Sequence, residues 1–149
     1  MSIKIRAAAP EDYAAWRALW NGYLEFYGST LAEEITRATW HKALSPASGI
    51  QCRLAEVDQQ VVGFAMCVLH EGTWVSQPVC YLEDLFVSPT ARGKGAGKAL
   101  IEGIGEEARQ QGWSKVYWVT RENNSARALY DKLATVDDFV RYTLNRQSR

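Results

Sequence analysis

The spacing of apolar positions changes several times along this chain, and each change marks an expected element. Ile3 and Ile5 alternate with polar residues and predict a short first strand. Over residues 13–27 apolar side chains, many of them aromatic, recur at steps of three and four, which predicts a helix that Gly28 ends. A second helix is expected over residues 31–44. The chain is therefore expected to begin with one strand and two helices.

From the middle of the chain onward, the pattern predicts a sheet. CRLAEV (52–57) and VVGFAMCVL (61–69) flank a turn and predict an antiparallel hairpin, and VCYLEDLFV (79–87) predicts another strand. These are followed by a helix that Gly112 ends, a strand over 115–120, a helix over about 125–133 and a final alternating strand over 139–144. Hairpins ahead of a strand–helix–strand–helix unit indicate a mixed α/β sheet with one parallel pair and helices on both faces.

Composition bounds the class of protein. The 149 residues suit a single domain, residues 1–149, and a hydrophobic content of 47% is enough for a core. Lysine plus arginine and aspartate plus glutamate balance at 17 each, so no overall field favours nucleic acid or an anionic membrane. The apolar stretches are too short to span a bilayer, and charges enter the N-terminus at once, unlike a signal peptide. We therefore expect a cytoplasmic protein that binds neither nucleic acid nor membrane.

The residues that could bind a metal are few and scattered. Cys52, Cys67 and Cys80 lie in apolar, strand-like runs without metal-ligand spacing, which favours buried, reduced thiols. His41 and His70 stand apart from any cluster of carboxylates or cysteines. No metal site is expected.

The segment ARGKGAGKAL (91–100) lies between an expected strand and an expected helix. It fails the Walker pattern, because Arg92 stands at its first glycine and Ala99 at the hydroxyl that would hold magnesium. It fails the dinucleotide fingerprint too, because Lys98 or Leu100 stands where the last glycine belongs. Glycines at a helix N-terminus expose backbone N–H groups beside partial positive charge, which suits a diphosphate. A flexible, solvated loop that only begins a helix is the alternative.

Two longer runs carry a family resemblance. LEDLFVSPTARGKGAGKALI (82–101) resembles the acetyl-coenzyme-A-binding core of the GNAT N-acetyltransferases, and VYWVTRENNSARALYDKLA (116–134) is similar to that family's downstream strand and helix. Within the family, these runs are most similar in sequence to the small diamine acetyltransferases and the fungal histone and D-amino-acid acetyltransferases. Residues 134–138 depart from the Leu-Gly-Phe of many members. The resemblance implies the GNAT fold, a mixed and mostly antiparallel sheet of about six or seven strands with a parallel, splayed central pair.

The resemblance also implies how the coenzyme is bound. Backbone amides of the Arg-x-x-Gly-x-Gly segment would wrap its pyrophosphate. Amides of Phe86 and Val87 would bind the pantetheine arm, and one amide would polarise the thioester carbonyl. The side chain of Asn123 would bond near the pantetheine, whereas Asn124 has a helix cap as its alternative role. The expected acetyl-CoA-binding residues are Phe86, Val87, Arg92, Gly93, Lys94, Gly95, Ala96, Gly97, Lys98, Asn123 and Tyr130.

Acetyl transfer to an amine needs a proton acceptor for the amine and benefits from a proton donor for the leaving thiolate. Tyr130 matches the family tyrosine that acts as general acid, and a phenol is protonated at neutral pH. Its alternative role is helix packing. Glu83 and Asp84 are adjacent acids in an apolar strand, so at least one should point into a partly enclosed space, where burial raises a carboxyl pKa. Glu83 is the candidate base, through water, and Asp84 is the second choice; attraction of a cationic substrate or pairing with an arginine is the alternative for Glu83.

Family members commonly form the acceptor pocket from the first two helices and the loop between them. Aromatic faces together with acids suit an ammonium group, although aromatic residues at helical spacing often belong to the core. The candidate acceptor-binding residues are Trp20, Tyr23, Glu25, Tyr27, Asp84 and Trp118.

The sequence thus predicts an enzyme, an N-acetyltransferase that moves an acetyl group from acetyl-CoA directly to a primary amine. A polyamine, an amino acid and a protein lysine or N-terminus all stay open as the acceptor. A catalytically silent acetyl-CoA sensor or partner-binding module is the alternative, and an NTPase is disfavoured by Arg92 and Ala99. Homodimers are common in the family, and the apolar C-terminal strand is a candidate for pairing between subunits.

Overall fold

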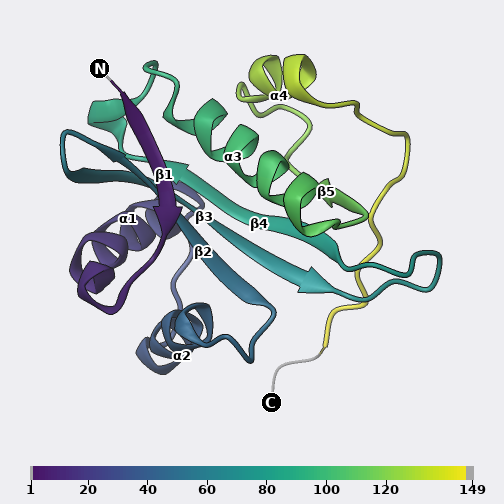
Figure 1. The fold of residues 1–149 in the computed structure, drawn as a ribbon, viewed down its shortest axis with the longest axis horizontal. Coiled ribbons are helices and arrows are strands. Elements are labelled where there is room, and N and C mark those ends of the chain that lie inside the picture. Colours follow the sequence, from purple (N-terminus) through teal and green to yellow (C-terminus); the bar gives the residue numbers. More distant parts are fainter. Residues whose placement is uncertain (1, 147–149) are drawn as a thin grey trace. The chain divides into compact units, whose positions relative to one another are not determined.

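The computed structural model describes residues 2–146, and Figure 1 traces them. Residues as far as Val119 and residues from Thr120 onward form two compact units. The first unit holds the sheet and most of the helices. Its elements are β1 (Ile3–Ala7), the 3-10 turn η1 (Pro10–Asp12), α1 (Tyr13–Phe26), α2 (Glu33–Leu44), β2 (Ile50–Val57), β3 (Gln60–His70), β4 (Val79–Val87), the 3-10 turn η2 (Pro89–Ala91), α3 (Ala96–Gln111) and β5 (Lys115–Tyr117).

The five strands form one sheet in the order β1-β2-β3-β4-β5. Every neighbouring pair is antiparallel except β4 and β5, which run parallel and pair only where Val79–Tyr81 meets Lys115–Tyr117. β4 continues to Val87, so its far half has no β5 partner on that edge. The predicted mixed sheet, its hairpin and its splayed parallel pair are therefore confirmed.

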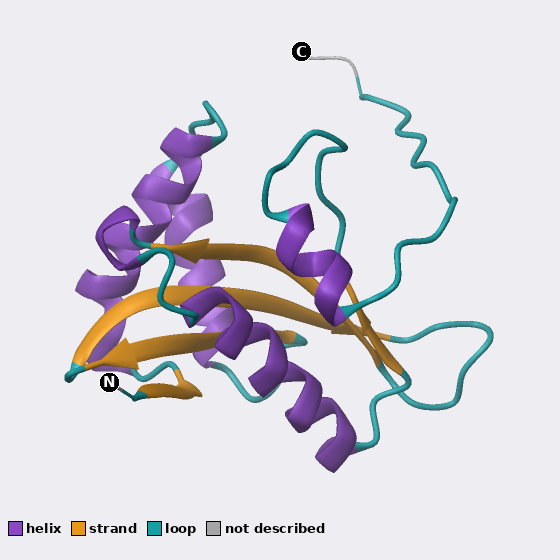
Figure 2. Cartoon of the chain, turned by 90° about the horizontal axis from the view of Figure 1, so that it is seen from above, coloured by secondary structure: helices purple, strands orange, loops and turns teal. Residues whose placement is uncertain are grey.

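Helices cover both faces of this sheet, as predicted (Figures 1 and 2). α1 and α2 pack on one face, where Trp16 stacks on Trp20 and Trp40 with ring centroids 5.1 Å and 4.9 Å apart. α3 packs on the opposite face through Leu100, Ile104 and other buried residues. Large aromatic side chains bury much apolar surface at little rotamer entropy, so the α1 face is a rigid support for whatever lies beside it.

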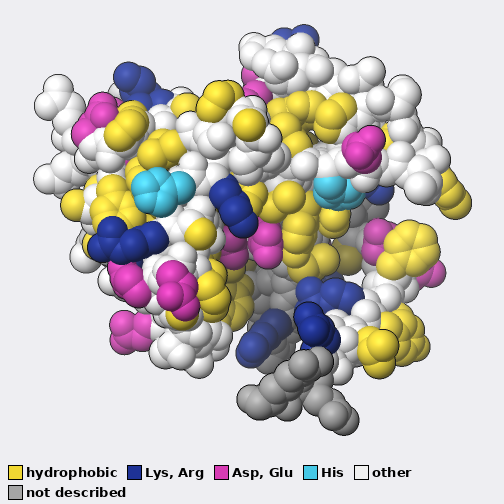
Figure 3. Space-filling model, turned by 90° about the horizontal axis from the view of Figure 1, so that it is seen from below, with side chains coloured by type: hydrophobic (Ala, Val, Ile, Leu, Met, Phe, Trp, Pro, Cys, Tyr) yellow, Lys and Arg dark blue, Asp and Glu magenta, His cyan; other side chains and the backbone are white. Residues whose placement is uncertain are grey.

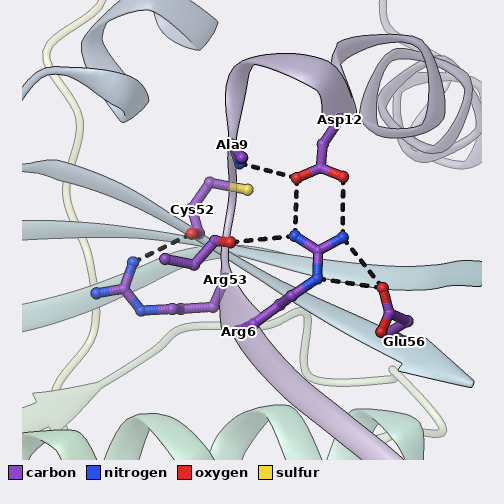
Figure 4. A network of polar contacts seen from close by, with 7 residues as sticks. Arg6, Ala9, Asp12, Cys52, Arg53 and Glu56 are labelled. Carbon is purple, nitrogen blue, oxygen red and sulfur yellow. Dashed lines mark hydrogen bonds and ion pairs between the residues drawn. The ribbon is translucent and has the colours of Figure 1, made fainter. Parts of the chain in front are cut away.

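A polar network fixes the start of α1 against the sheet (Figure 4). Arg6 of β1 donates to both carboxylate oxygens of Asp12, at 2.8 Å and 2.9 Å, and to Glu56 of β2 at 3.2 Å. The Ala9 N–H also donates to Asp12, at 2.8 Å. The Arg6 guanidinium holds the pKa of Asp12 below its usual value, because it stabilises the ionised carboxylate. These bonds join β1, β2 and the turn that leads into α1.

Charged side chains of both signs lie on the surface. On the face drawn in Figure 3, lysine and arginine side chains are interspersed with aspartate and glutamate, consistent with the balance of 17 against 17. Among the residues that the structure describes, no helix combines the length and apolar character needed to cross a bilayer.

Two sequence expectations about strands are wrong. The strand expected over 115–120 ends at Tyr117, and residues 139–144 form no strand, so within the described residues 2–146 the sheet has five strands instead of six or seven. Alternation makes a segment suitable for a sheet, but a strand forms only where a neighbour supplies ladder hydrogen bonds. The second unit instead contributes one short helix, α4 (Arg127–Leu133).

Candidate active site

β4 carries one residue more than its antiparallel partner β3 at the centre of the candidate site. Met66 of β3 lies opposite Asp84. The next residue, Cys67, lies opposite Leu82, which leaves Glu83 without a partner. Such a β-bulge interrupts the strict alternation of side chains and re-aims those beside it. Two neighbouring acids can then serve the same space, where regular pleating would send them to opposite faces.

Both acids do line one cavity, of about 250 Å³, on the α1 and α2 side of the sheet. Most of its wall is apolar or aromatic, with the two carboxylates as the charged groups, a composition typical of small-molecule sites. The sequence expected at least one of the acids in an enclosed space, and the bulge brings in both. The lining residues are Trp20, Tyr23, Leu24, Leu31, Thr39, Ile50, Met66, Val68, Glu83 and Asp84.

A hydrogen bond joins Tyr23 and Asp84 in this cavity. The Tyr23 hydroxyl donates to Oδ1 of Asp84 at 2.6 Å, which joins α1 to β4. Burial raises the pKa of Asp84 to about 6, against the opposing effect of the Tyr23 hydrogen bond, and the Glu83 charge adds to the rise. Burial, followed by the Asp84 charge, raises the pKa of Tyr23, so this hydroxyl stays protonated and remains a donor. Asp84 is thus ionised at neutral pH with a basicity above that of an ordinary carboxylate.

Glu83 has a different environment from its neighbour. It is exposed, whereas Asp84 is part-buried. The ion pairs that the structure gives within residues 2–119 include neither carboxylate, and pairing of Glu83 with an arginine stays an untested alternative. The two acids thus differ in exposure although both line the same cavity.

The glycine-rich segment has the geometry expected of an anion site. Gly93 and Gly95 adopt φ values of +78° and +91°, in the left-handed region that side chains rarely enter. Gly95 is the N-cap of α3, which begins at Ala96, has no side-chain cap and carries no acid in its first turn. The first N–H groups of the helix are therefore left for an external acceptor at the positive end of the helix dipole. A diphosphate fits these donors.

Arg92 connects this segment to β4. Its Nε donates to the Val87 carbonyl at 3.0 Å, and its guanidinium carbon lies 5.2 Å from the centre of the Phe86 ring. Lys94 and Lys98 are exposed on either side of the helix start. Positive charge thus gathers where the unpaired half of β4 leads into α3.

The second unit holds two further predicted residues. Asn123 is exposed, and Tyr130 lies half-buried on α4. The Asn124 side chain accepts a hydrogen bond from the Ala126 N–H at 2.9 Å, so it holds the turn in front of α4 and does not cap the helix itself. The coenzyme role of Asn123 and the catalytic role of Tyr130 stay predictions.

The acceptor candidates divide into two groups. Trp20 belongs to both the core and the cavity wall. It is buried, and its Nε1 donates to Thr36 Oγ1 at 3.2 Å. Its ring also lines the cavity. Glu25, Tyr27 and Trp118 are not among the described residues that line the cavity, and their roles stay predictions.

Sequence reasoning missed the aliphatic wall of the cavity. Met66 and Val68 come from β3, Ile50 from β2, Thr39 from α2 and Leu31 from the segment between the first two helices. The period-two spacing of Met66 and Val68 predicts that both lie on one face of the sheet. Whether Asp84 lies on that same face depends on the register between β3 and β4.

These features define a class of protein: a mixed sheet with a short, splayed parallel pair and a glycine-rich, uncapped helix start that follows β4. Residues 13–134 match the Acetyltransferase (GNAT) family. The chain belongs to this family, and it is an N-acetyltransferase.

Individual relatives agree with this assignment. Over 146 residues, the chain is 34% identical to the D-amino-acid N-acetyltransferase HPA3 of Saccharomyces cerevisiae, covering 96% of this chain and 91% of the relative. It is 32% identical over 146 residues to the uncharacterized N-acetyltransferase YhfO of Bacillus subtilis, covering 96% and 97%. A solved structure of AAC(6')-Iy with the bisubstrate analog CoA-S-monomethyl-acetylneamine shares the fold, with a TM-score of 0.79, 20% identity and 99% of both chains covered. A probable acetyltransferase of known structure has a TM-score of 0.85 at 24% identity, covering 98% and 99%.

Proposed function

We propose that the protein transfers an acetyl group from acetyl-CoA to the amino group of an acceptor bound in the cavity beside Glu83 and Asp84. The observation that carries this proposal is the dual role of β4. One end of its unpaired half holds the two carboxylates, and the other end leads through Val87 into the glycine-rich segment. Nothing in the family match or among the relatives supports a silent sensor in place of an enzyme.

We treat residues 1–149 as one catalytic domain, because the family match crosses both compact units. Limited proteolysis that released a stable piece ending near residue 119 would oppose this proposal.

Coenzyme binding is assigned to the residues predicted from the sequence. The N–H groups of residues 93–98 would bind the diphosphate, with Arg92, Lys94 and Lys98 adding charge. The unpaired edge of β4 at Phe86 and Val87 would bind the pantetheine arm, and Asn123 would assist. The coenzyme supplies the activated acetyl group as a thioester.

Proton transfer is assigned to three residues. The attacking amine loses a proton as its nitrogen bonds to the acetyl carbon, and the departing sulfur gains one. Asp84 is the preferred acceptor on geometric grounds, because it is part-buried and held by Tyr23, whereas Glu83, the acceptor predicted from the sequence, is exposed and stays the second candidate. Tyr130 is the proposed donor to the leaving thiolate, on the strength of its match to the family tyrosine.

Release of free coenzyme thiol, measured against a panel of amines, tests the proposed function. The panel includes polyamines, amino acids of both hands and lysine peptides, because one relative is a D-amino-acid N-acetyltransferase and another a ribosomal-protein alanine N-acetyltransferase. Acetyl-CoA-dependent acetylation of at least one amine is expected. Tight acetyl-CoA binding without turnover of any panel member would support the sensor alternative.

Gly95→Val is expected to raise the dissociation constant of coenzyme A by at least about tenfold, measured by calorimetry. A branched side chain strains a backbone at φ +91° and obstructs the donors at the helix start. Gly95→Asn tolerates this backbone and should weaken binding less. Gly105→Ala on the same helix, where an added Cβ contacts nothing within 4 Å, is the matched control and should leave the constant unchanged. An unchanged constant in Gly95→Val would contradict the assignment of this loop.

We further propose a homodimer in which residues 139–144 pair with a second copy of the chain. Alternate side chains of this segment are apolar and exposed, with Val140 at 75% and Leu144 at 98% of full exposure, although the segment has no ladder partner in its own chain. Sedimentation velocity should give a dimer, and Val140→Asp with Leu144→Asp should give a monomer. Thr143→Asp, on the other side of the segment, is the control. A monomeric unmodified protein at micromolar concentration would refute the dimer.

The three free, buried cysteines support a reducing compartment, and we place the protein in the cytoplasm, which cell fractionation tests.

A further inference from the structure

The Phe86 ring packs closely against α1, the helix that contributes to the acceptor cavity. An added Cβ at Gly22 would lie 3.1 Å and 3.2 Å from two carbon atoms of this ring, whereas carbon atoms pack at roughly 3.5–4.0 Å. Glycine has a lower helix propensity than alanine, so a glycine in the middle of α1 calls for a packing reason. The close approach of α1 to Phe86 supplies that reason.

Two further side chains contact the same ring. Tyr23 of α1 meets it edge to face, with ring centroids 6.1 Å apart and an interplanar angle of 75°. The guanidinium carbon of Arg92 lies 5.2 Å from the ring centre, which is a cation–π contact. Phe86 is only 8% exposed, so the ring itself is held by its surroundings. It therefore connects α1 directly to the glycine-rich segment.

Each of these neighbours also belongs to one of the two proposed binding sites. The Tyr23 hydroxyl donates to Asp84 at 2.6 Å inside the acceptor cavity. Arg92 Nε donates to the Val87 carbonyl at 3.0 Å, which uses one of the five N–H donors of a guanidinium. The other donors can still reach a phosphate. A continuous series of contacts, all in the first compact unit, thus runs from the cavity through Phe86 to the glycine-rich segment.

We propose that Phe86 is a positioning residue that couples the coenzyme-binding segment to the acceptor cavity, by holding Arg92 on one side and Tyr23 on the other. This inference rests on the proposed function, which assigns Arg92 to the coenzyme and the cavity to the amine. A change at Tyr23, on the acceptor side, then alters the affinity for coenzyme A. By thermodynamic linkage, bound coenzyme alters the affinity for the acceptor by the same factor that the acceptor alters its own.

The physical reason is the conformational entropy of an exposed arginine. Arg92 has many rotamers, and fixing it on a diphosphate costs entropy at the moment of binding. A ring that already holds the guanidinium lowers this cost. The ring keeps its place only while α1 packs against it, so truncation of Tyr23 lets Phe86 tilt and weakens the support of Arg92. Leucine at position 86 keeps apolar volume but offers no ring face to the cation.

The affinity for coenzyme A, measured by calorimetry with no acceptor present, tests the coupling in a double-mutant cycle. We expect Tyr23→Leu to raise the dissociation constant about fivefold and Phe86→Leu about tenfold. The double variant should also show about tenfold, because the first substitution acts through the ring that the second removes. Independent contacts would instead multiply to about fiftyfold. A melting curve confirms that each variant is folded.

Two control variants separate this role from general packing. Tyr23→Phe keeps the ring that packs on Phe86 and loses only the hydroxyl that holds Asp84, so the affinity for coenzyme A should not change. Phe64 is a buried ring that contacts both Tyr23 and Phe86. Phe64→Leu therefore reproduces a loss of core packing beside the same residues, and it too should leave the coenzyme affinity unchanged.

Gly22→Ala is a second probe that leaves no void in the core. The added methyl group displaces the Phe86 ring, while alanine improves the helix propensity of α1. We expect the dissociation constant of coenzyme A to rise about fivefold. Gly105→Ala on α3, where an added Cβ meets nothing within 4 Å, is the matched control and should have no effect. If Phe86→Leu does not fold, Gly22→Ala carries the test alone.

The outcomes distinguish this inference from the proposed function. Additive effects in the cycle, an unchanged constant in Gly22→Ala, or an equal loss of affinity in Phe64→Leu would overturn the coupling. If the protein still acetylates an amine of the panel, the proposed function survives that result. Non-additive effects in a protein that acetylates no amine would uphold the coupling and refute the proposed function. Failure of the unmodified protein to bind coenzyme A would overturn both.

Discussion

Asp84→Asn is expected to lower kcat/KM for the acceptor amine by about 100- to 1,000-fold, the usual contribution of a positioned general base. The substitution keeps the shape of the side chain and an oxygen that can accept the Tyr23 hydrogen bond, so the fold should persist. What disappears is a carboxylate that can take the proton from the attacking nitrogen. Steady-state kinetics with the best amine of the panel measures the loss, and a melting curve checks the fold.

The pH dependence separates proton transfer from simple attraction of a cation. Because burial raises the pKa of Asp84 to about 6, the carboxylate becomes protonated, and unable to accept a proton, as pH falls through that value. The unmodified enzyme should therefore lose kcat/KM below about pH 6, and Asp84→Asn should lack this acid limb. Glu83→Gln is the matched comparison and should keep it. If Glu83→Gln instead removes the acid limb of the kcat/KM profile while Asp84→Asn retains it, the general base is Glu83, as the sequence predicted.

Tyr130→Phe is expected to lower kcat by about 100-fold, at the lower end of the range for general-acid catalysis, because a thiolate leaves more readily than most groups. The affinity for coenzyme A should change little, since the ring is retained and only the hydroxyl is lost. Pre-steady-state measurement of the acetyl-transfer step ensures that chemistry and not product release is observed.

Tyr142→Phe provides the control for that experiment. Tyr142 belongs to the same compact unit, and Tyr142→Phe keeps the ring for the proposed pairing of residues 139–144 with a second copy, so loss of its hydroxyl should leave kcat unchanged. Full transfer rate in Tyr130→Phe, with chemistry rate-limiting, would remove Tyr130 from the acid role and leave the thiolate to depart without a donor from this chain.

The elements that the sequence predicted correctly are those with local signals. The helical spacing over residues 13–27 gave α1, and the glycines at 93 and 95 indicated backbone that side chains disfavour, where the structure has positive φ values. The parallel pairing of β4 with β5 followed from the helix between them, because a crossover connection is what parallel strands require. In each case the pattern and its cause lie within a short stretch of chain.

The details that the sequence did not predict depend on partners distant in the sequence. The extra residue at Glu83 is visible only when β4 is aligned with β3, because a bulge is a mismatch between two strands and not a property of one. The Tyr23 to Asp84 hydrogen bond joins residues far apart in the chain. The expected strand over 139–144 was wrong for a related reason: its alternation is present, but its own chain offers no ladder for it to join.

The bulge also changes how substitutions along β4 should be interpreted. Before it, the odd-numbered Tyr81 lies opposite Val68, whose side chain reaches the cavity side of the sheet. After it, the even-numbered Asp84 and Phe86 take that side. The side chains of β4 that face the cavity side therefore change from odd-numbered to even-numbered residues at Glu83. A relative with one residue fewer at this point would have an unbroken alternation along β4, in which the counterparts of Asp84 and Phe86 still face the cavity side and only the extra position of Glu83 is lost.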